Sequence, residues 1–313
     1  MIGSGLSSGR NRTLRDQAPG YFRMIIGDLE ITSIYDGFID VDRNLLTGKP
    51  AEDLFEILDK NYFPADRIAT SNSNFVIDDG HSLTLIDAGT GSFFGASMGR
   101  NVENLEAAGF DLQAISKVLL THAHPDHICG LVCGDEKTFP NATIYVAKTE
   151  YDYWTDRAAW HAATEEMRPV FAEVQKAVKP YREEDQLVAY EYGEIHPGIV
   201  ARPLQGHSPG HSGYEFGTTD GDILFWGDIV HNHVLQFADP GVSVELDQDI
   251  GAARETRERI IKEAADRRLL IGGAHLPFPA LGRVVQTDRG FGWRPVEFGP
   301  TIAPQNVVHL KKH

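Results

Sequence analysis

The sequence predicts a mixed α/β fold in which two β-rich halves lie between helices. Runs of strands and helices occur twice along the chain, with no short-period repeat. The 313 residues are 42% hydrophobic, which is enough for a buried core without disulfide support. A dense cluster of histidine and aspartate follows an apolar strand near the middle of the chain.

The first half of the chain alternates strand patterns with two amphipathic helical patterns. Strands are expected where β-branched and apolar residues are bounded by Gly and Asp turns, and helices where apolar residues recur at helical spacing. The expected elements are a hairpin or two adjacent strands over 24–39, a helix over 51–61, strands over 73–77 and 82–87, a helix over 101–108 with Gly109 as its C-cap, and a strand over 115–120.

The second half repeats this alternation after a helical middle. Residues 148–179 are rich in Ala, Glu and Lys and contain no glycine, which favours one or two helices. Further on we expect strands over 186–192, 199–204, 214–216 and 223–226, a helix capped by Asp247 and running to about residue 267, and a strand over 269–271. Residues 1–20, rich in Gly, Ser and Arg, are expected to form a flexible arm.

The charge balance disfavours nucleic acid and membrane partners. The chain has 29 basic and 45 acidic residues, and its net charge of −16 repels phosphate backbones and anionic membrane surfaces. No apolar stretch is long enough to span a membrane, and the N-terminus lacks the apolar core of a secretory signal. A cytoplasmic location is therefore the default expectation, although a processed periplasmic or secreted protein would have the same features.

Histidine and cysteine usage points to a metal site built from nitrogen and oxygen ligands. The chain has thirteen histidines but only two cysteines, Cys129 and Cys133. Their spacing predicts one helical face, a poor geometry for a disulfide, and we expect both to be small buried hydrophobes.

The strongest chemical signal is the segment from Thr121 to His127, which follows an apolar strand. It contains His122, His124, Asp126 and His127, four potential ligands within six residues. Because the strand ends here and a helix is expected to begin near Asp126, this one segment can present ligands to two adjacent ions.

Three further candidate ligands each follow a predicted strand. His207 follows the strand over 199–204, Asp228 follows that over 223–226, and His275 follows that over 269–271. Strand ends hold side chains rigidly enough to fix ligand geometry. Together with the cluster, they form a complete candidate set for two ions.

With this ligand set, the chain resembles the metallo-β-lactamase superfamily, whose H-x-H-x-D-H motif stands here as residues 122–127. The likeness extends from Ser71 to His275. It implies a four-layer αββα sandwich forming one domain over residues 21–313, with the site at one edge of the two sheets. It also implies one metal held by His122, His124 and His207, a second held by Asp126, His127 and His275, Asp228 bridging both, and Asp87 and His211 lying behind the ligands.

Within the superfamily, short strings resemble methyl parathion hydrolase and its lactonase and arylesterase relatives. These strings lie at 18–24, 27–32, 92–100 and 275–279. The resemblance implies a homodimer and an apolar pocket. We expect the pocket to be lined by Phe93, Phe94, Trp154, Leu276 and Phe278; Trp160 has similar chemistry without support from the likeness.

These features predict hydrolysis of a small hydrophobic ester, either a lactone, an aryl ester or an organophosphate triester. Two metals about 3.5–4 Å apart can share a water, lower its pKa and supply a bridging hydroxide. Asp126 and Asp228 are the expected catalytic residues. Zinc is the first choice for two divalent ions, with iron, manganese or cobalt as alternatives.

Other activities are compatible with the same expected fold. A thioester hydrolase of the glyoxalase II type or a β-lactamase is the main alternative, and a non-catalytic metal-binding module is a further one. A nuclease would need a basic groove, and a flavodiiron oxidoreductase would need altered ligands and often a flavin module.

Overall fold

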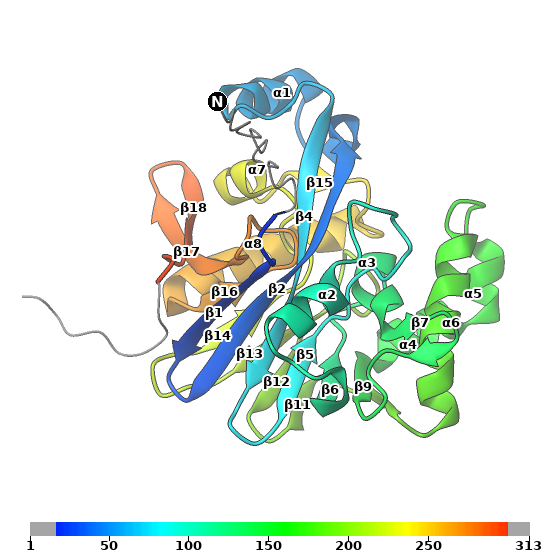
Figure 1. The fold of residues 1–313 in the computed structure, drawn as a ribbon. Helices are drawn as coiled ribbons and strands as arrows, with labels where there is room; N and C mark the ends of the chain where they lie inside the picture. The colour runs from blue at the N-terminus through cyan, green and yellow to red at the C-terminus, as the bar shows by residue number, and fades with distance from the viewer. Residues whose placement is uncertain (1–16, 300–313) are drawn as a thin grey trace, which may run out of the picture.

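Two seven-stranded β-sheets form the centre of the protein in a computed structural model that describes residues 17–299 (Figure 1). The first sheet contains, in spatial order, β1 (Tyr21–Ile26), β2 (Leu29–Asp42), β4 (Arg67–Asp78), β5 (Leu83–Ile86), β6 (Ile115–Leu119), β9 (Thr143–Ala147) and β10 (Leu187–Tyr190). The second contains β11 (Gly193–His196), β12 (Ile199–Pro203), β13 (Ser212–Phe216), β14 (Ile223–Phe225), β16 (Leu270–Gly272), β17 (Leu281–Thr287) and β18 (Gly290–Pro295). Each half of the chain thus builds one sheet.

Helices and short elements connect the strands. The helices are α1 (Ala51–Lys60), α2 (Asn101–Ala107), α3 (Pro125–Ile128), α4 (Lys148–Thr155), α5 (Arg157–Ala162), α6 (Arg168–Glu183), α7 (His233–Ala238) and α8 (Ile250–Arg267). Short 3₁₀ helices are η1 (Arg43–Leu45), η2 (Leu112–Ala114) and η3 (Cys129–Leu131). Two small ribbons pair β3 (Leu46–Thr47) with β15 (Ser243–Val244), and β7 (Val132–Cys133) with β8 (Glu136–Lys137).

Alternation along the strands of the first sheet separates two hydrophobic cores. In β4, Phe75 and Ile77 face the second sheet, whereas Val76 faces the helices. The core between the sheets continues to α8 through Ile260. The core on the outer face of the first sheet includes Phe171 of α6. The layers are therefore helices, sheet, sheet and helix, and the αββα expectation is confirmed.

The β2–β4 pair extends beyond the rest of its sheet and carries α1 at its far end (Figure 1). Pairing continues to Asp42 and Arg67. A third, smaller apolar cluster joins α1 to α7 and to the β3–β15 ribbon, with Leu54, Leu58 and Leu235 among its members. This extension forms one wall of the cavity described below.

Most predicted elements are confirmed to within a few residues, namely the β1–β2 hairpin, α1, α2, α8, and strands β5, β6, β10, β12, β13, β14 and β16; β4 is also present but begins at Arg67, six residues before the predicted start at 73. The middle segment differs, since it forms three helices rather than one or two. The β17–β18 hairpin was not predicted, because its strands are only partly buried and lack strong apolar alternation.

Two local expectations were wrong. Asp247 does not cap α8; Asp249 does, by accepting a hydrogen bond from the amide of Ala252 at 3.0 Å. The two cysteines are free, as expected, but they do not share a helical face. Cys129 is buried in η3, whereas Cys133 is exposed in β7 because the chain turns from helix into strand between them.

Chain boundaries are described only in part. Most of the expected arm, residues 1–16, lies outside the described residues, as do residues 300–313. The expectation of one domain over 21–313 stays a prediction, which the shared core between the sheets supports for the described part. No helix within residues 17–299 has the length and apolarity needed to cross a membrane.

The loop between β5 and α2 closes tightly at its base through glycine. Gly99 has φ of +81°, and a Cβ added there would lie 2.1 Å from the carbonyl oxygen of Gly91. Gly80, in the β4–β5 turn, has a similar φ of +79° but nothing within 4 Å of an added Cβ. A side chain at Gly80 would therefore meet backbone strain alone, whereas a side chain at Gly99 would meet both strain and a steric clash.

We predict that Gly80→Ala lowers the free energy of unfolding by about 1–2 kcal/mol, because the left-handed backbone disfavours a side chain. Gly99→Ala should cost about 1–3 kcal/mol more, because its methyl group also meets backbone. Urea unfolding of both variants measures the difference. Equal losses would show that the base of the loop is not closely packed.

Candidate metal centre

The histidine-rich turn is fixed by the end of β6 and the start of α3. Pro125 occupies the first turn of α3, so the helix begins directly after His124. The backbone amide and hydroxyl of Thr121 donate to the two carboxylate oxygens of Asp87 at 2.7 and 2.8 Å. Asp87 follows β5 and has φ of +59°. The predicted strand-end loop at Asp87 therefore anchors the beginning of the turn.

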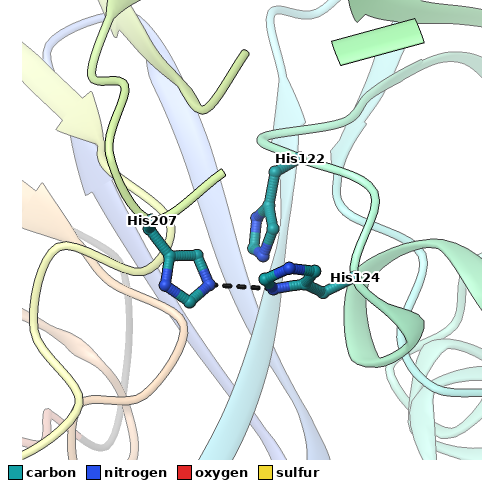
Figure 2. A group of neighbouring side chains, drawn as sticks. All are labelled: His122, His124 and His207. Atoms are coloured by element: carbon teal, nitrogen blue, oxygen red, sulfur yellow. Dashed lines mark hydrogen bonds between the residues drawn. The ribbon is translucent and has the colours of Figure 1, made fainter. Parts of the chain in front are cut away.

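Three histidines form the first ligand group. Nitrogen atoms of His122, His124 and His207 lie within 4.8 Å of one another. Nδ1 of His124 is 2.9 Å from Nε2 of His207, and the three rings converge in Figure 2. His207 comes from the loop after β12, so this group joins the two halves of the chain.

Two carboxylates and two histidines form the second group: Asp126, His127, Asp228 and His275. Nε2 of His275 is 2.8 Å from Oδ2 of Asp228 and 3.5 Å from Oδ2 of Asp126. Nε2 of His127 is 3.2 Å from Oδ1 of Asp228. Asp228 also lies 3.3 Å from His207 of the first group, so it is in contact with both groups.

The buried polar atoms of these groups match what a cation requires. Nε2 of His122, Nε2 of His127 and Oδ1 of Asp228 are buried and make no hydrogen bond, although the last two atoms lie 3.2 Å apart. An unpartnered buried polar atom is costly, and a metal ion would satisfy all three. Imidazole and carboxylate donors are those preferred by zinc and neighbouring divalent metals. The two groups are therefore able to bind metal ions.

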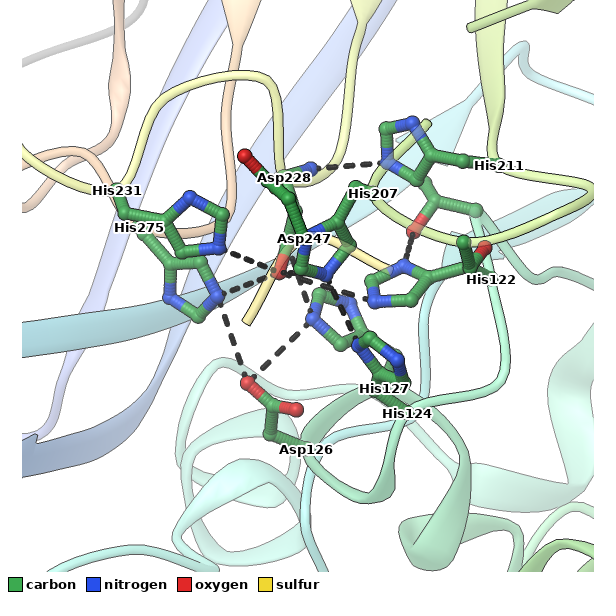
Figure 3. A network of polar contacts seen from close by, with 12 residues as sticks. His122, His124, Asp126, His127, His207, His211, Asp228, His231, Asp247 and His275 are labelled. Carbon is green, nitrogen blue, oxygen red and sulfur yellow. Dashed lines mark hydrogen bonds and ion pairs between the residues drawn. The ribbon is translucent and has the colours of Figure 1, made fainter. Parts of the chain in front are cut away.

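Outer hydrogen bonds orient the ligand rings (Figure 3). Nδ1 of His127 lies 2.9 Å from Asp87, Nδ1 of His207 lies 2.9 Å from Asp247, and Nδ1 of His275 lies 2.8 Å from the carbonyl oxygen of Ser71. Such partners fix the tautomer and direct the other nitrogen to a metal. In each ring Nε2 is consequently left to face the centre.

Asp247 is a functional residue that the sequence did not reveal. Its carboxylate lies between His207 and the fully buried Arg257, whose Nη2 is 3.0 Å from Oδ2. Arg257 is held in turn by the carbonyl oxygens of Ile229 and Val242. This chain of contacts offsets the buried charge of Asp247 and fixes the orientation of His207.

His211 contacts the backbone of Asp228. Its Nδ1 donates to the carbonyl oxygen of Leu204, and its Nε2 accepts the backbone amide of Asp228 at 3.0 Å. This pattern requires a neutral ring. Burial and the nearby His207 lower the pKa of His211 to about 3, which keeps it neutral.

The histidines of the centre differ in pKa. Burial lowers the pKa of His122 and His124 well below the ordinary value. Burial also opposes charge on His127, but the carboxylates around it outweigh this and raise its pKa well above the ordinary value. His207 shows the same balance, with hydrogen bonds to Asp228 and Asp247 raising its pKa to about 9. Metal binding must therefore displace a proton from His127 and from His207, whose pKa values are raised.

A cavity of about 840 Å³ opens onto the centre. Its walls come from the β2–β4 extension, the β5–α2 loop, α5, α6 and the segment after β15. The lining includes the ligands His124, Asp126, His207, Asp228 and His275 together with Ile39, Val41, Leu46, Ile68, Phe93, Phe94, Tyr153, Met167, Val170, Val244 and Leu246. Phe93 and Phe94, which we expected in the substrate pocket, line this cavity.

The other predicted pocket residues lie elsewhere. Trp154 and Leu276 are fully buried, because α4 turns Trp154 toward α6 and Leu276 belongs to the core between the sheets. Phe278 is partly exposed and packs edge-on against Tyr35 outside the cavity lining. Trp154 still contacts the site indirectly, since its ring lies 5.8 Å from that of His124.

His231 also lies at the centre and was not predicted. Its Nε2 is 3.4 Å from Oδ2 of Asp228, its ring stacks on His275 at 5.1 Å, and it lines the cavity. His231 lies three residues after Asp228 and beyond the end of β14. It does not follow a strand directly, so the strand pattern did not identify it as a candidate ligand.

Comparisons with known proteins agree with this geometry. The family model of the Metallo-beta-lactamase superfamily matches residues 68–275. No curated protein matched the chain significantly.

Solved structures show the same fold over most of the chain. The chain is 34% identical to the hydrolase AbOPH of the beta lactamase superfamily, with a TM-score of 0.88, covering 91% of this chain and 100% of that one. It is 26% identical to AidC, a dizinc quorum-quenching lactonase in complex with a product, N-hexanoyl-L-homoserine, with a TM-score of 0.81 and coverage of 90% and 98%. A probable metal-dependent hydrolase from Staphylococcus aureus, 21% identical, has a TM-score of 0.67 and coverage of 80% and 91%.

We predict that Asp247→Asn weakens metal affinity about 10- to 100-fold, because His207 loses the carboxylate that orients it. Asp249→Ala should instead cost about 1 kcal/mol of stability, as expected for a lost helix cap, and leave metal affinity unchanged. Chelator competition and urea unfolding of both variants distinguish the two roles. Equal metal affinity in Asp247→Asn and the unsubstituted protein would contradict the assignment.

Proposed function

Because the chain belongs to the metallo-β-lactamase superfamily, we propose that it is a hydrolase with two divalent metal ions that cleaves small hydrophobic lactones, aryl esters or organophosphate triesters. The observation that carries this proposal is the pair of ligand groups, joined by Asp228, at the wall of a largely apolar cavity.

In this proposal, His122, His124 and His207 hold one ion, Asp126, His127 and His275 hold the other, and Asp228 contacts both. When bound, two divalent ions lower the pKa of a water and polarise a substrate C=O or P=O oxygen. Zinc fits the donor set, and AidC, which is a dizinc lactonase, supports it. Iron, manganese and cobalt are the alternatives.

The residues of the chain supply the remaining parts of the reaction. Asp87, Asp247 and His211 hold the ligands so that the centre does not reorganise during turnover. Asp126 lines the cavity, and its side chain is 14% exposed compared with 3% for Asp228. It is therefore the carboxylate of the centre best placed to take up a proton released by the attacking water.

The charges around the cavity favour a neutral substrate. Besides the metal-site residues, the lining contains Asp40, Asp42, Glu166 and Glu245, and no lysine or arginine of residues 17–299 lines it. Away from the metal ions, an anionic substrate would meet like charges and no cationic side chain among the lining residues. Most β-lactams and glutathione thioesters carry carboxylates, so the lining side chains disfavour the two alternative activities on the same fold.

The solved structures support the choice of a lactone as the first substrate to test. AidC acts as a lactonase, and its product carries an apolar hexanoyl chain. The apolar wall formed by Phe93, Phe94, Met167 and Val170 could accept such a chain or an aryl ring. We also propose a homodimer, as in the methyl parathion hydrolase group that the sequence resembles; light scattering of the purified protein tests it.

We predict that the zinc- or cobalt-loaded protein hydrolyses dihydrocoumarin with a kcat/KM about tenfold or more above that for methyl paraoxon. Asp228→Ala should abolish most of either activity, since the residue shared by both ligand groups is lost. The reverse preference would identify an organophosphate hydrolase. Activity on neither substrate would contradict the proposed substrate class.

We predict further that the enzyme discriminates against negative charge. An aryl ester bearing a carboxylate should have a kcat/KM at least about tenfold below that of its neutral methyl ester analogue, because the lining carboxylates repel it. High salt should narrow the difference. Equal kcat/KM values at low salt would show that the cavity carboxylates do not select the substrate.

A further inference from the structure

Glu150 is a fully buried carboxylate that the proposed reaction does not use. It lies in the first turn of α4 and accepts four hydrogen bonds. Oε1 accepts the amide of Ala123 at 2.9 Å and the indole N–H of Trp154 at 2.7 Å. Oε2 accepts the hydroxyl of Ser208 and the amide of Gly210, both at 2.7 Å.

This arrangement requires a carboxylate. All four partners donate, and each oxygen of Glu150 accepts two hydrogen bonds. A glutamine of the same shape would direct its amide N–H groups toward two of these donors. The cost of burying a charged group is offset here by four donors, of which two are backbone amides that could not easily find other partners.

Three of the four partners of Glu150 belong to the two loops that carry the three-histidine group, and the fourth, Trp154, belongs to α4. Ala123 lies between His122 and His124, and Ser208 directly follows His207. The contact is also close, since a Cβ added at Gly210 would lie 2.3 Å from the backbone nitrogen of Glu150. Glu150 therefore connects both ligand loops to the start of α4.

Asp87 holds the opposite side of the same turn. It binds Thr121 and His127, whereas Glu150 binds the amide of Ala123 and extends to the loop at Ser208. Asp87 contacts His127 of the second group directly and reaches His122 of the first group through the hydroxyl of Thr121. The loop contacts of Glu150 flank ligands of the first group alone.

We propose that Glu150 is a positioning residue for the metal ion bound by His122, His124 and His207. It sets the distance between the loop at 121–127 and the loop at 207–211, and so determines the affinity of this group for a divalent ion while leaving the second group nearly unchanged. The inference rests on the proposed two-metal centre, and its readout is metal binding rather than hydrolysis.

The four hydrogen bonds of Glu150 provide matched variants. Ser208→Ala removes a bond to a ligand loop, whereas Trp154→Phe removes a bond made within α4. Asp152→Asn alters an exposed carboxylate of the same helix that pairs with Lys148. If Glu150 had a purely structural role, the Trp154 and Ser208 variants would have the same metal affinity. If it positions the ligand loops, only the Ser208 variant should bind metal more weakly.

The test is competition between the cobalt-loaded protein and a chelator, with the thermal unfolding midpoint of each metal-free variant measured alongside. Glu150→Gln should lose about tenfold or more in affinity for one of two ions. At a chelator concentration that leaves two ions on the unsubstituted protein, the Glu150→Gln variant should keep only one ion. Anomalous scattering from its crystals should place the remaining cobalt at the second group.

Ser208→Ala should show a smaller loss in the same direction, and Trp154→Phe and Asp152→Asn should retain both ions. If Glu150→Gln does not fold, the metal affinities of Ser208→Ala and Trp154→Phe are compared instead. Unchanged affinity, equal loss of both ions, or equal effects in the Ser208 and Trp154 variants would overturn the inference. An unsubstituted protein that binds no ion would overturn the proposed function and this inference with it.

Discussion

The buried carboxylate of Asp228 lies among five histidine rings, and the positive charge that these rings can carry or bind stabilises it. The Nε2 atoms of these rings lie 2.8 Å (His275), 3.3 Å (His207), 3.4 Å (His231) and 3.7 Å (His122) from Oδ2, and 3.2 Å (His127) from Oδ1. Removing an ion from water costs on the order of several kcal/mol even after relaxation. The rings can offset this desolvation cost by carrying protons or by binding metal cations together with the carboxylate. The unpartnered atoms on His122, His127 and Asp228 favour cations.

The two-sheet architecture brings the required groups to one edge. The turn after β6 comes from the first sheet, while the segments after β12, β14 and β16 come from the second. β14 and β16 are buried along their whole length, whereas β12 alternates between buried and more exposed residues. Behind the ligands, Asp87, Asp247 and Glu150 are carboxylates buried in the protein, and each holds one loop against another. Carboxylates therefore lie both within the candidate centre and behind it, and a largely apolar cavity opens on the remaining side.

The part of the site that sequence could predict is the part encoded locally. Four candidate ligands stand within six residues, and the remaining three follow apolar strands. The strand pattern, the cluster and the family likeness together predicted them. Asp247 could not be found in this way, because its partner His207 lies forty residues earlier and its own neighbourhood resembles a helix N-terminus. Glu150 stands in a segment rich in Lys and Glu, which normally indicates an exposed helical face. Trp154 was assigned to the pocket on its aromatic chemistry and the family likeness, whereas packing of α4 on α6 turns it into the core. Long-range packing, which no local pattern records, decided all three.

The most direct test of the metal centre is the anomalous scattering of zinc in crystals of the zinc-loaded protein, measured on either side of the zinc absorption edge. Two peaks are expected, one among His122, His124 and His207 and the other among Asp126, His127 and His275, with Asp228 in contact with both. Two such peaks would confirm that the buried carboxylate is balanced by two cations. A single peak would restrict the account to one ion, and the absence of any peak at these residues would contradict it.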